Sequence, residues 1–203
     1  MPSLLNTLLL ASALSTFYIG TVAGLEWARR KFNFSPEITR RVVHVFSGLS
    51  TLLDFLLLPG PWFLALIAIS LVGIAASQKF GWLTSVHEVR RRTYGEVFLP
   101  VGTLSTYAAT SGEPRLFIPA LLIMTFADAA SGITSDLLRL QRKSLRGSAV
   151  FFAVATGILL GFATPIWHAV LFAFVLTVVE RISKWGSDNL TIPLAAGLLL
   201  RLL

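Results

Sequence analysis

Residues 116–136 read LFIPALLIMTFADAASGITSD. As a helix, an apolar run of this length crosses the ~30 Å hydrocarbon core of a membrane. The run nevertheless carries Asp128, about two helical turns inside its far end. An ionised carboxylate at that depth costs a few kcal/mol unless a partner, a cavity or a metal ion receives it. The stretch therefore predicts a membrane helix that carries a functional acidic group.

The composition of the whole chain favours the same class. Of its 203 residues, 55% are hydrophobic and only 13% are charged, unlike a soluble domain. We expect an all-α, polytopic integral membrane helix bundle of about seven or eight transmembrane helices. It forms a single transmembrane domain (1–203), with a peripheral first helix (1–30) and a motif-bearing core (36–193). The predicted spans are residues 4–25, 42–58, 61–77, 96–110, 116–136, 148–164, 166–182 and 189–203.

The basic residues predict the orientation in the membrane. All of the 17 Lys and Arg except Arg115 and Arg201 fall in or beside alternate loops. Short cytoplasmic loops carry such an excess of basic residues, so both termini are expected to face outward. If the cell is prokaryotic, we expect the protein in its inner or plasma membrane. The net charge of +7 then lies at membrane edges. It indicates lipid head groups and nucleotide phosphates as partners, and no nucleic acid.

The densest polar chemistry follows Asp128. At about 100° per residue, Ser131, Gly132, Ser135 and Asp136 share its broad helix face. This small, polar face is explained either by close helix packing with a paired Asp128 or by a functional site. With no Cys in the chain, Cys-based metal sites and thiolate nucleophiles are excluded.

The loop that follows ends in Lys143, Ser144, Gly147 and Ser148. It has two interpretations. One is an ordinary basic loop in which Ser148 caps the next helix. The other is a phosphate site, in which the Lys143 ammonium and backbone N–H groups of the Gly147–Ser148 turn bind the oxygens at a helix N-terminus. The loop alone does not discriminate between them.

A second polar stripe leads into the predicted span at 42–58. Ser35 and Pro36 are predicted as the N-cap and first helical position. Arg40, His44 and Gly48 then recur at i, i+4 and i+8, entering the membrane from the cytosolic side. A guanidinium at the head of such a stripe suits phosphate.

Two further groups lie at the ends of later spans. Arg90 and Arg91 are explained as a positive-inside anchor, whereas Glu96 stands at the threshold of an apolar run. Glu180 lies inside a run, which favours function, and Asp188 begins the last span, where an acid is often only a cap.

In order along the chain, four motifs resemble those of the dolichol kinase and phytol kinase family. They are Arg-Arg-x-x-His-x-x-x-Gly, Arg-x-Tyr-Gly-Glu, Asp-Ala-Ala with Lys-Ser-x-x-Gly-Ser, and Glu followed by Asp-Asn-x-x-x-Pro, between Arg40 and Pro193. The resemblance implies phosphorylation of a lipid alcohol, with CTP as the usual donor and a divalent metal, expected to be Mg²⁺. Many members have Glu where this chain has Arg146, and plant phytol and farnesol kinases lack that Glu. This favours an isoprenoid alcohol such as phytol, farnesol, geranylgeraniol or a polyprenol.

The resemblance and the layout together nominate residues for each role. Asp128 is expected to receive the alcohol proton, and Asp128 and Lys143 are the catalytic candidates. Metal candidates are Asp128, Asp136, Glu180 and Asp188. Nucleotide and phosphate candidates are Arg41, His44, Arg92, Lys143, Ser144, Gly147, Ser148 and Asn189, with Arg40, Gly48, Glu96 and Gly132 as further site residues.

Other functions were weighed against a lipid kinase. The chain has no G-x-x-x-x-G-K-[ST] run, which excludes a P-loop kinase. A cytidylyltransferase acting on a lipid phosphate would use the same nucleotide but release pyrophosphate. A membrane carrier would place ionisable residues near the midplane, whereas the acids here lie toward one face. Homo-oligomerisation is left open.

Overall fold

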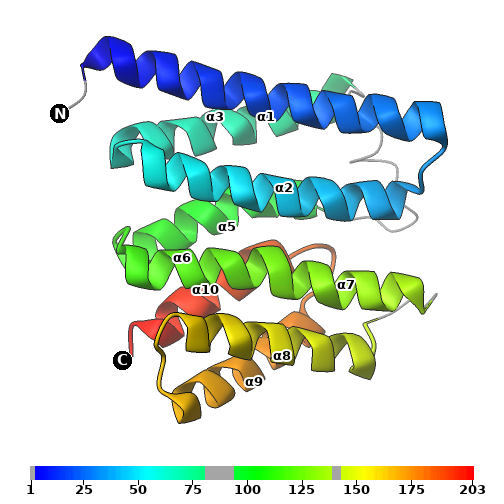
Figure 1. Ribbon diagram of the computed structural model, residues 1–203, viewed down its shortest axis with the longest axis vertical. Helices are drawn as coiled ribbons and strands as arrows, with labels where there is room; N and C mark the ends of the chain where they lie inside the picture. The colour runs from blue at the N-terminus through cyan, green and yellow to red at the C-terminus, as the bar shows by residue number, and fades with distance from the viewer. Residues whose placement is uncertain (1–2, 81–93, 139–142) are drawn as a thin grey trace. The chain divides into compact units, whose positions relative to one another are not determined.

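The computed structural model describes residues 3–80, 94–138 and 143–203, with only the backbone for 78–80 (Figure 1). All regular structure in these ranges is helical, and the predicted class, an all-α polytopic membrane protein, is confirmed. Its elements are α1 (Leu4–Phe32), α2 (Pro36–Leu57), α3 (Gly60–Phe80), α5 (Gly95–Thr110), α6 (Pro114–Leu122), the π-helical η1 (Ile123–Ala127), α7 (Asp128–Leu137), α8 (Leu145–Gly161), α9 (Ile166–Ile182) and α10 (Asp188–Leu200).

Three stretches within the described helices are long and apolar enough to cross a membrane. They are Leu4–Phe32, Gly60–Ser77 and Pro114–Leu137, and the last of them runs through α6, η1 and α7. Helices α8 and α10 are apolar but shorter. The number of crossings therefore stays a prediction, while the helix positions follow the predicted spans closely.

The chain divides into two compact units, Met1–Arg90 and Arg91–Leu203. In the first unit, α1 continues past the apolar run that was predicted to end at residue 25. It does so because Glu26 pairs along the helix with Arg29 and Arg30, at 3.0 and 2.7 Å. Helix α2 begins as predicted, with the Ser35 hydroxyl accepting from the Ile38 amide.

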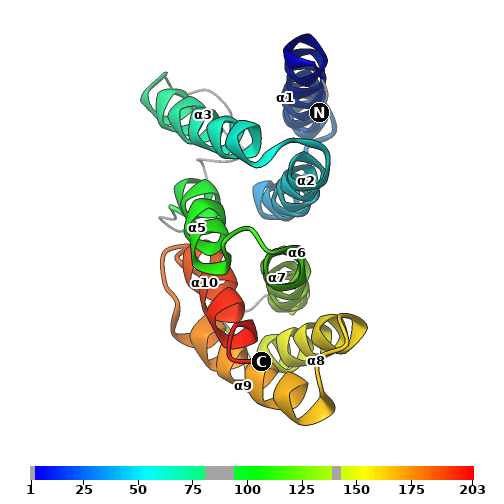
Figure 2. The ribbon, with the colours of Figure 1, turned by 90° about the vertical axis from the view of Figure 1, so that its left-hand side faces the viewer.

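The second unit is built around the continuous helix α6–η1–α7. Helices α8 and α10 both contact it, and α10 also contacts α5 and α9 (Figures 1 and 2). The core between them is formed by Phe117, Leu121, Met124, Phe151, Leu176 and Ile192, all almost fully buried. Buried apolar contact thus fixes these helices relative to one another.

Helices α5 and α10 approach unusually closely. A Cβ built on Gly102 would lie 2.1 Å from the Asn189 carbonyl oxygen and 2.8 Å from the Leu190 Cα. The Asn189 side-chain amide also donates to the Gly95 carbonyl oxygen at 2.7 Å. This contact places the first turn of α5 beside the first turn of α10.

Two local features differ from the prediction. Helix α8 begins at Leu145 rather than at residue 148, because the Ser144 hydroxyl, not that of Ser148, caps it by accepting from the Gly147 amide at 3.0 Å. The prediction that Ser148 caps this helix is wrong. The π-helical turn η1, directly before Asp128, was not predicted. Such turns often occur at functional sites.

Replacing Gly102 with Ala should lower stability by about 1–3 kcal/mol, because the new methyl group meets backbone atoms that cannot move independently. Gly157→Ala in α8 is the matched control, since nothing lies within 4 Å of its Cβ position. Thermal unfolding in detergent measures both. Equal unfolding temperatures for the two variants would contradict the close α5–α10 contact.

Candidate functional site: an ammonium between carboxylates

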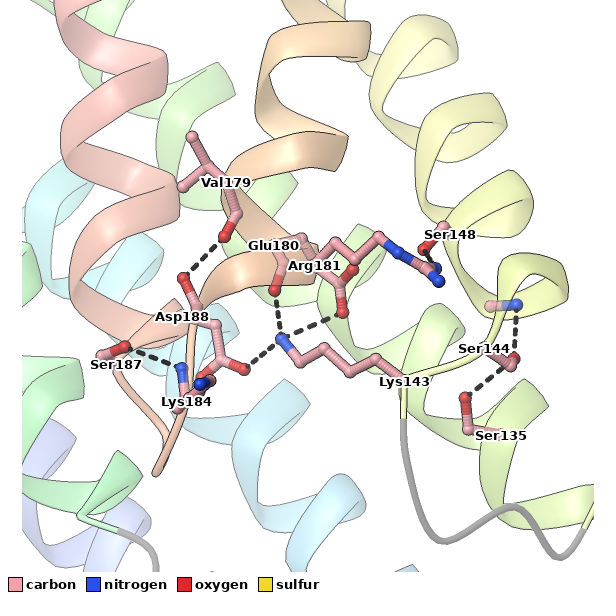
Figure 3. Close-up of polar contacts among 12 residues, drawn as sticks. Ser135, Lys143, Ser144, Ser148, Val179, Glu180, Arg181, Lys184, Ser187 and Asp188 are labelled. Carbon is pink, nitrogen blue, oxygen red and sulfur yellow. Dashed lines mark hydrogen bonds and ion pairs between the residues drawn. The ribbon is translucent and has the colours of Figure 1, made fainter.

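The side chain of Lys143 reaches from the start of α8 to the ends of α9 and α10 (Figure 3). Its ammonium lies 3.0 Å from Glu180 Oε1 and 3.0 Å from Asp188 Oδ2. It also donates to the Glu180 backbone carbonyl. One cation therefore joins the last turn of α9, the first residue of α10 and the loop before α8.

The turn between α9 and α10 brings the two carboxylates together. Its residues Trp185 and Gly186 have positive φ, at 55° and 84°, so the chain reverses over a few residues. The hydroxyls of Ser183 and Thr191 lie 2.8 Å apart across the turn. The Trp185 carbonyl accepts from the Tyr94 amide at 2.8 Å, which fixes the turn to the start of α5.

Neighbouring negative charges keep the side chain of Lys143 protonated. Burial lowers the pKa of its ammonium, but the negative charges of Asp188, Glu180 and Asp128 outweigh burial and raise that pKa above its usual value. Asp128, 7% exposed, comes from α7. Carboxylates from three helices thus act on one cation.

The second carboxylate oxygen of Glu180 has no partner. Glu180 is 2% exposed, and its Oε2 is buried without a hydrogen bond. A buried acceptor without a donor costs about 1–3 kcal/mol. This oxygen is available to accept a hydrogen bond or to bind a cation.

Hydroxyl groups line the N-terminal end of α8 next to Lys143. The Ser144 hydroxyl lies 3.4 Å from that of Ser135 on α7, and Arg181 donates to the Ser148 hydroxyl at 3.3 Å (Figure 3). A Cβ on Gly147 would lie 3.0 Å from the Ser131 carbonyl oxygen. Glycine at this position therefore favours the close approach of α8 to α7.

The remaining predicted residues of the second unit lie around this cluster. Asp136 is exposed next to the end of α7, and Glu96 is half-buried in the first turn of α5. Gly132 is buried on α7, and Asn189 is buried with its amide on the Gly95 carbonyl. The phosphate role of Asn189 and the metal role of Asp136 stay predictions.

The predicted residues of the first unit are on α2. Arg40, Arg41 and His44 are half-buried, and Gly48 is buried. Because the two units are not placed relative to each other, the structure describes these residues only within their own helix. Arg92 lies outside the described residues. The roles predicted for all five stay predictions.

The carboxylates do not form an open metal centre in the described part of the chain. No group of three or more His, Asp or Glu residues is arranged there to hold a metal ion. Glu180 and Asp188 instead share the Lys143 ammonium. The possible metal ligands are these two carboxylates, and of their oxygens Glu180 Oε2 is buried without a hydrogen bond.

Sequence reasoning missed two polar groups. Arg181 was counted only as a topology signal, and its contact with Ser148 has no sequence signature. Asp54 on α2 is 7% exposed, and no hydrogen bond in the described chain reaches its carboxylate. Its position inside the apolar run 42–58 was the signal that could have identified it.

Together these features define an all-helical membrane protein whose site gathers carboxylates from several helices around one cation. No family model and no solved structure matches the chain. A phytol kinase of Synechocystis sp. is 28% identical over an alignment of 210 positions, which covers 94% of this chain and 90% of that protein. This similarity along nearly the whole length agrees with the resemblance to the phytol and dolichol kinase family.

Replacing Lys143 with Met should lower stability by about 2–3 kcal/mol, because it leaves buried carboxylates without a counter-ion. Adding Glu180→Gln to Lys143→Met should recover part of the loss, since it removes the most buried of these charges. Thermal unfolding of the single and double variants checks the coupling. Strictly additive losses would contradict the ion pair.

Proposed function

We propose that the protein transfers the γ-phosphoryl group of a nucleoside triphosphate, with CTP the expected donor, to the hydroxyl of an isoprenoid alcohol. The observation that carries this proposal is the Lys143 ammonium between Glu180 and Asp188, with buried Asp128 close enough for its charge to act on the same cation. The similarity to a phytol kinase over most of the chain supports it. The proposed reaction takes place at the cytosolic boundary of a multi-pass membrane protein.

The arrangement suits phosphoryl transfer because that reaction requires mainly alignment and charge neutralisation. The isoprenoid tail would lie among apolar helices, while the nucleotide arrives from water. The alcohol oxygen forms a bond to the γ-phosphorus, and the bond from that phosphorus to the β–γ bridging oxygen breaks. Asp128 accepts the hydroxyl proton, and the nucleoside diphosphate leaves.

Phosphate oxygens have suitable donors beside the carboxylates. The N-terminal end of α8 carries the partial positive charge of a helix N-terminus, and the Ser144 and Ser148 hydroxyls lie there. Arg181, exposed and in contact with Ser148, adds a guanidinium. These groups would orient the triphosphate toward Asp128.

The donor set also fits a divalent cation, expected to be Mg²⁺. Mg²⁺ is usually bound through one or two carboxylates together with substrate phosphates and water, so a complete protein cage is not needed. Glu180, whose Oε2 has no partner, and Asp188 would hold it. The chemistry that such a cation would supply, when bound, is neutralisation of charge on the phosphates.

One assay tests the proposal and its rival. Purified protein in detergent is incubated with phytol, farnesol, geranylgeraniol, a polyprenol or diacylglycerol and with CTP, UTP or ATP. We expect an isoprenoid monophosphate and a nucleoside diphosphate. Pyrophosphate released with a lipid phosphate as substrate would instead identify a cytidylyltransferase, and no product with any pair would contradict both.

Asp128→Asn should reduce transfer by about 100-fold or more, because the amide cannot accept the hydroxyl proton. Initial rates report the effect, and thermal unfolding shows whether the variant still folds. Glu113→Gln is the control, since Glu113 is an exposed residue before α6 and the same change there should leave the rate unaltered. Near-normal turnover of a folded Asp128→Asn protein would rule out this role.

A further inference from the structure

The ammonium of Lys143 is held by three acceptor atoms of the protein. It donates hydrogen bonds to the Glu180 backbone carbonyl and to Asp188 Oδ2, and it forms an ion pair with Glu180 Oε1 (Figure 3). A lysine ammonium has three N–H donors, so these contacts take up most of its hydrogen-bonding capacity. The residue predicted to bind phosphate is therefore occupied elsewhere.

The same arrangement leaves one buried acceptor unsatisfied. Glu180 Oε2 has no hydrogen bond, although the Lys143 ammonium contacts the other oxygen of the same carboxylate, Oε1. The Lys143 ammonium contacts one carboxylate oxygen of Glu180 and one of Asp188. A divalent cation would place twice the charge between the same two side chains. The position between Glu180 and Asp188 is thus a cation position that an ammonium fills incompletely.

We propose that Lys143 is a built-in counter-ion, which occupies the divalent-cation position between Glu180 and Asp188 until nucleotide and cation arrive together, and then moves to the phosphates. This inference rests on the proposed function, because it assigns the order in which the same site is filled. With Lys143 in this role, binding of the divalent cation depends on the nucleotide.

The position of Lys143 makes this movement feasible. Lys143 directly precedes Ser144, the N-cap of α8, so its flexible side chain is attached beside the proposed phosphate site. Rotation about side-chain bonds would carry the ammonium from the carboxylates toward the helix N-terminus. No helix has to move, because the backbone of Lys143 is already at the junction.

Charge balance sets the order of events. Removing the ammonium alone would leave Glu180 and Asp188 uncompensated beside Asp128, which is unfavourable for buried groups. The exchange therefore requires an incoming cation. Because Mg²⁺ commonly arrives bound to phosphates, the nucleotide supplies both the replacement cation and the new partner for Lys143.

The test measures Mn²⁺ binding by electron paramagnetic resonance, with purified protein in detergent and without lipid substrate. Wild-type protein should bind Mn²⁺ weakly alone and at least about tenfold more tightly with CTP, because the resident ammonium opposes the cation. Lys143→Met should bind Mn²⁺ at least about tenfold more tightly than wild type without CTP. Adding Asp188→Asn to Lys143→Met should abolish the gain.

Lys184→Met is the matched control, because Lys184 is an exposed lysine in the neighbouring turn and the same charge is removed. It should bind Mn²⁺ as wild type does. Mn²⁺ should also raise the unfolding temperature of Lys143→Met but not that of wild type. Equal Mn²⁺ affinities for wild type and Lys143→Met would overturn the proposal.

The wild-type titration is decisive even if Lys143→Met fails to fold. Tight Mn²⁺ binding without nucleotide would show that Lys143 does not hold the position. Failure of the proposed function has a different signature, namely no phosphorylation of any alcohol with any nucleotide. The binding and transfer assays therefore distinguish the two failures.

Discussion

Buried carboxylates in an apolar helical bundle need a cation, and in the second unit that cation is the Lys143 ammonium. Asp128, Glu180 and Asp188 come from α7, α9 and α10, and the charges of all three act on the Lys143 ammonium. The flexible side chain of Lys143, which precedes α8, thus brings a positive charge to carboxylates of three helices. This contact joins the start of α8 to the α9–α10 turn, and the Trp185 carbonyl joins that turn to the first residues of α5.

This arrangement connects stability and chemistry. Acidic groups are costly in an apolar bundle, and those of Glu180 and Asp188 are paired with the Lys143 ammonium. Ser144 and Gly147 hold α8 close to α7, which brings the Lys143 backbone near the carboxylates. Similarity to a phytol kinase supports the proposed lipid-kinase chemistry, and the ion-pair cluster is where we propose that it is located.

Much of the fold could be predicted from apolar length alone. The spans at 61–77, 96–110 and 166–182 match α3, α5 and α9 within a few residues, because hydrophobic runs and proline breaks set helix ends. The extension of α1 and the true cap of α8 depend on particular side-chain contacts, of Glu26 and Ser144. The π-turn before Asp128 has no signal in the sequence.

The site was predicted in part. Asp128, Glu180 and Asp188 stood out because charged residues in apolar runs are costly, and the structure brings all three to Lys143. Their convergence on one lysine could not be predicted, since residues 143, 180 and 188 meet only through helix packing and the α9–α10 turn. Asp136, which helical periodicity predicts on the same broad face as Asp128, is exposed near the end of α7, and its metal role stays a prediction. Asp54, which is also buried inside an apolar run, could have been identified from the same cost of a charged residue.

The central claim is that the Lys143 ammonium directly contacts the carboxylates of α9 and α10. Zero-length carbodiimide coupling in native membranes tests it, because this reagent joins an amine only to a carboxylate in contact with it, and peptide mass spectrometry locates the bond. We predict an isopeptide bond from Lys143 to Asp188 or Glu180 that disappears when the protein is denatured. Coupling of Lys143 only to other carboxylates in the folded protein would contradict the account.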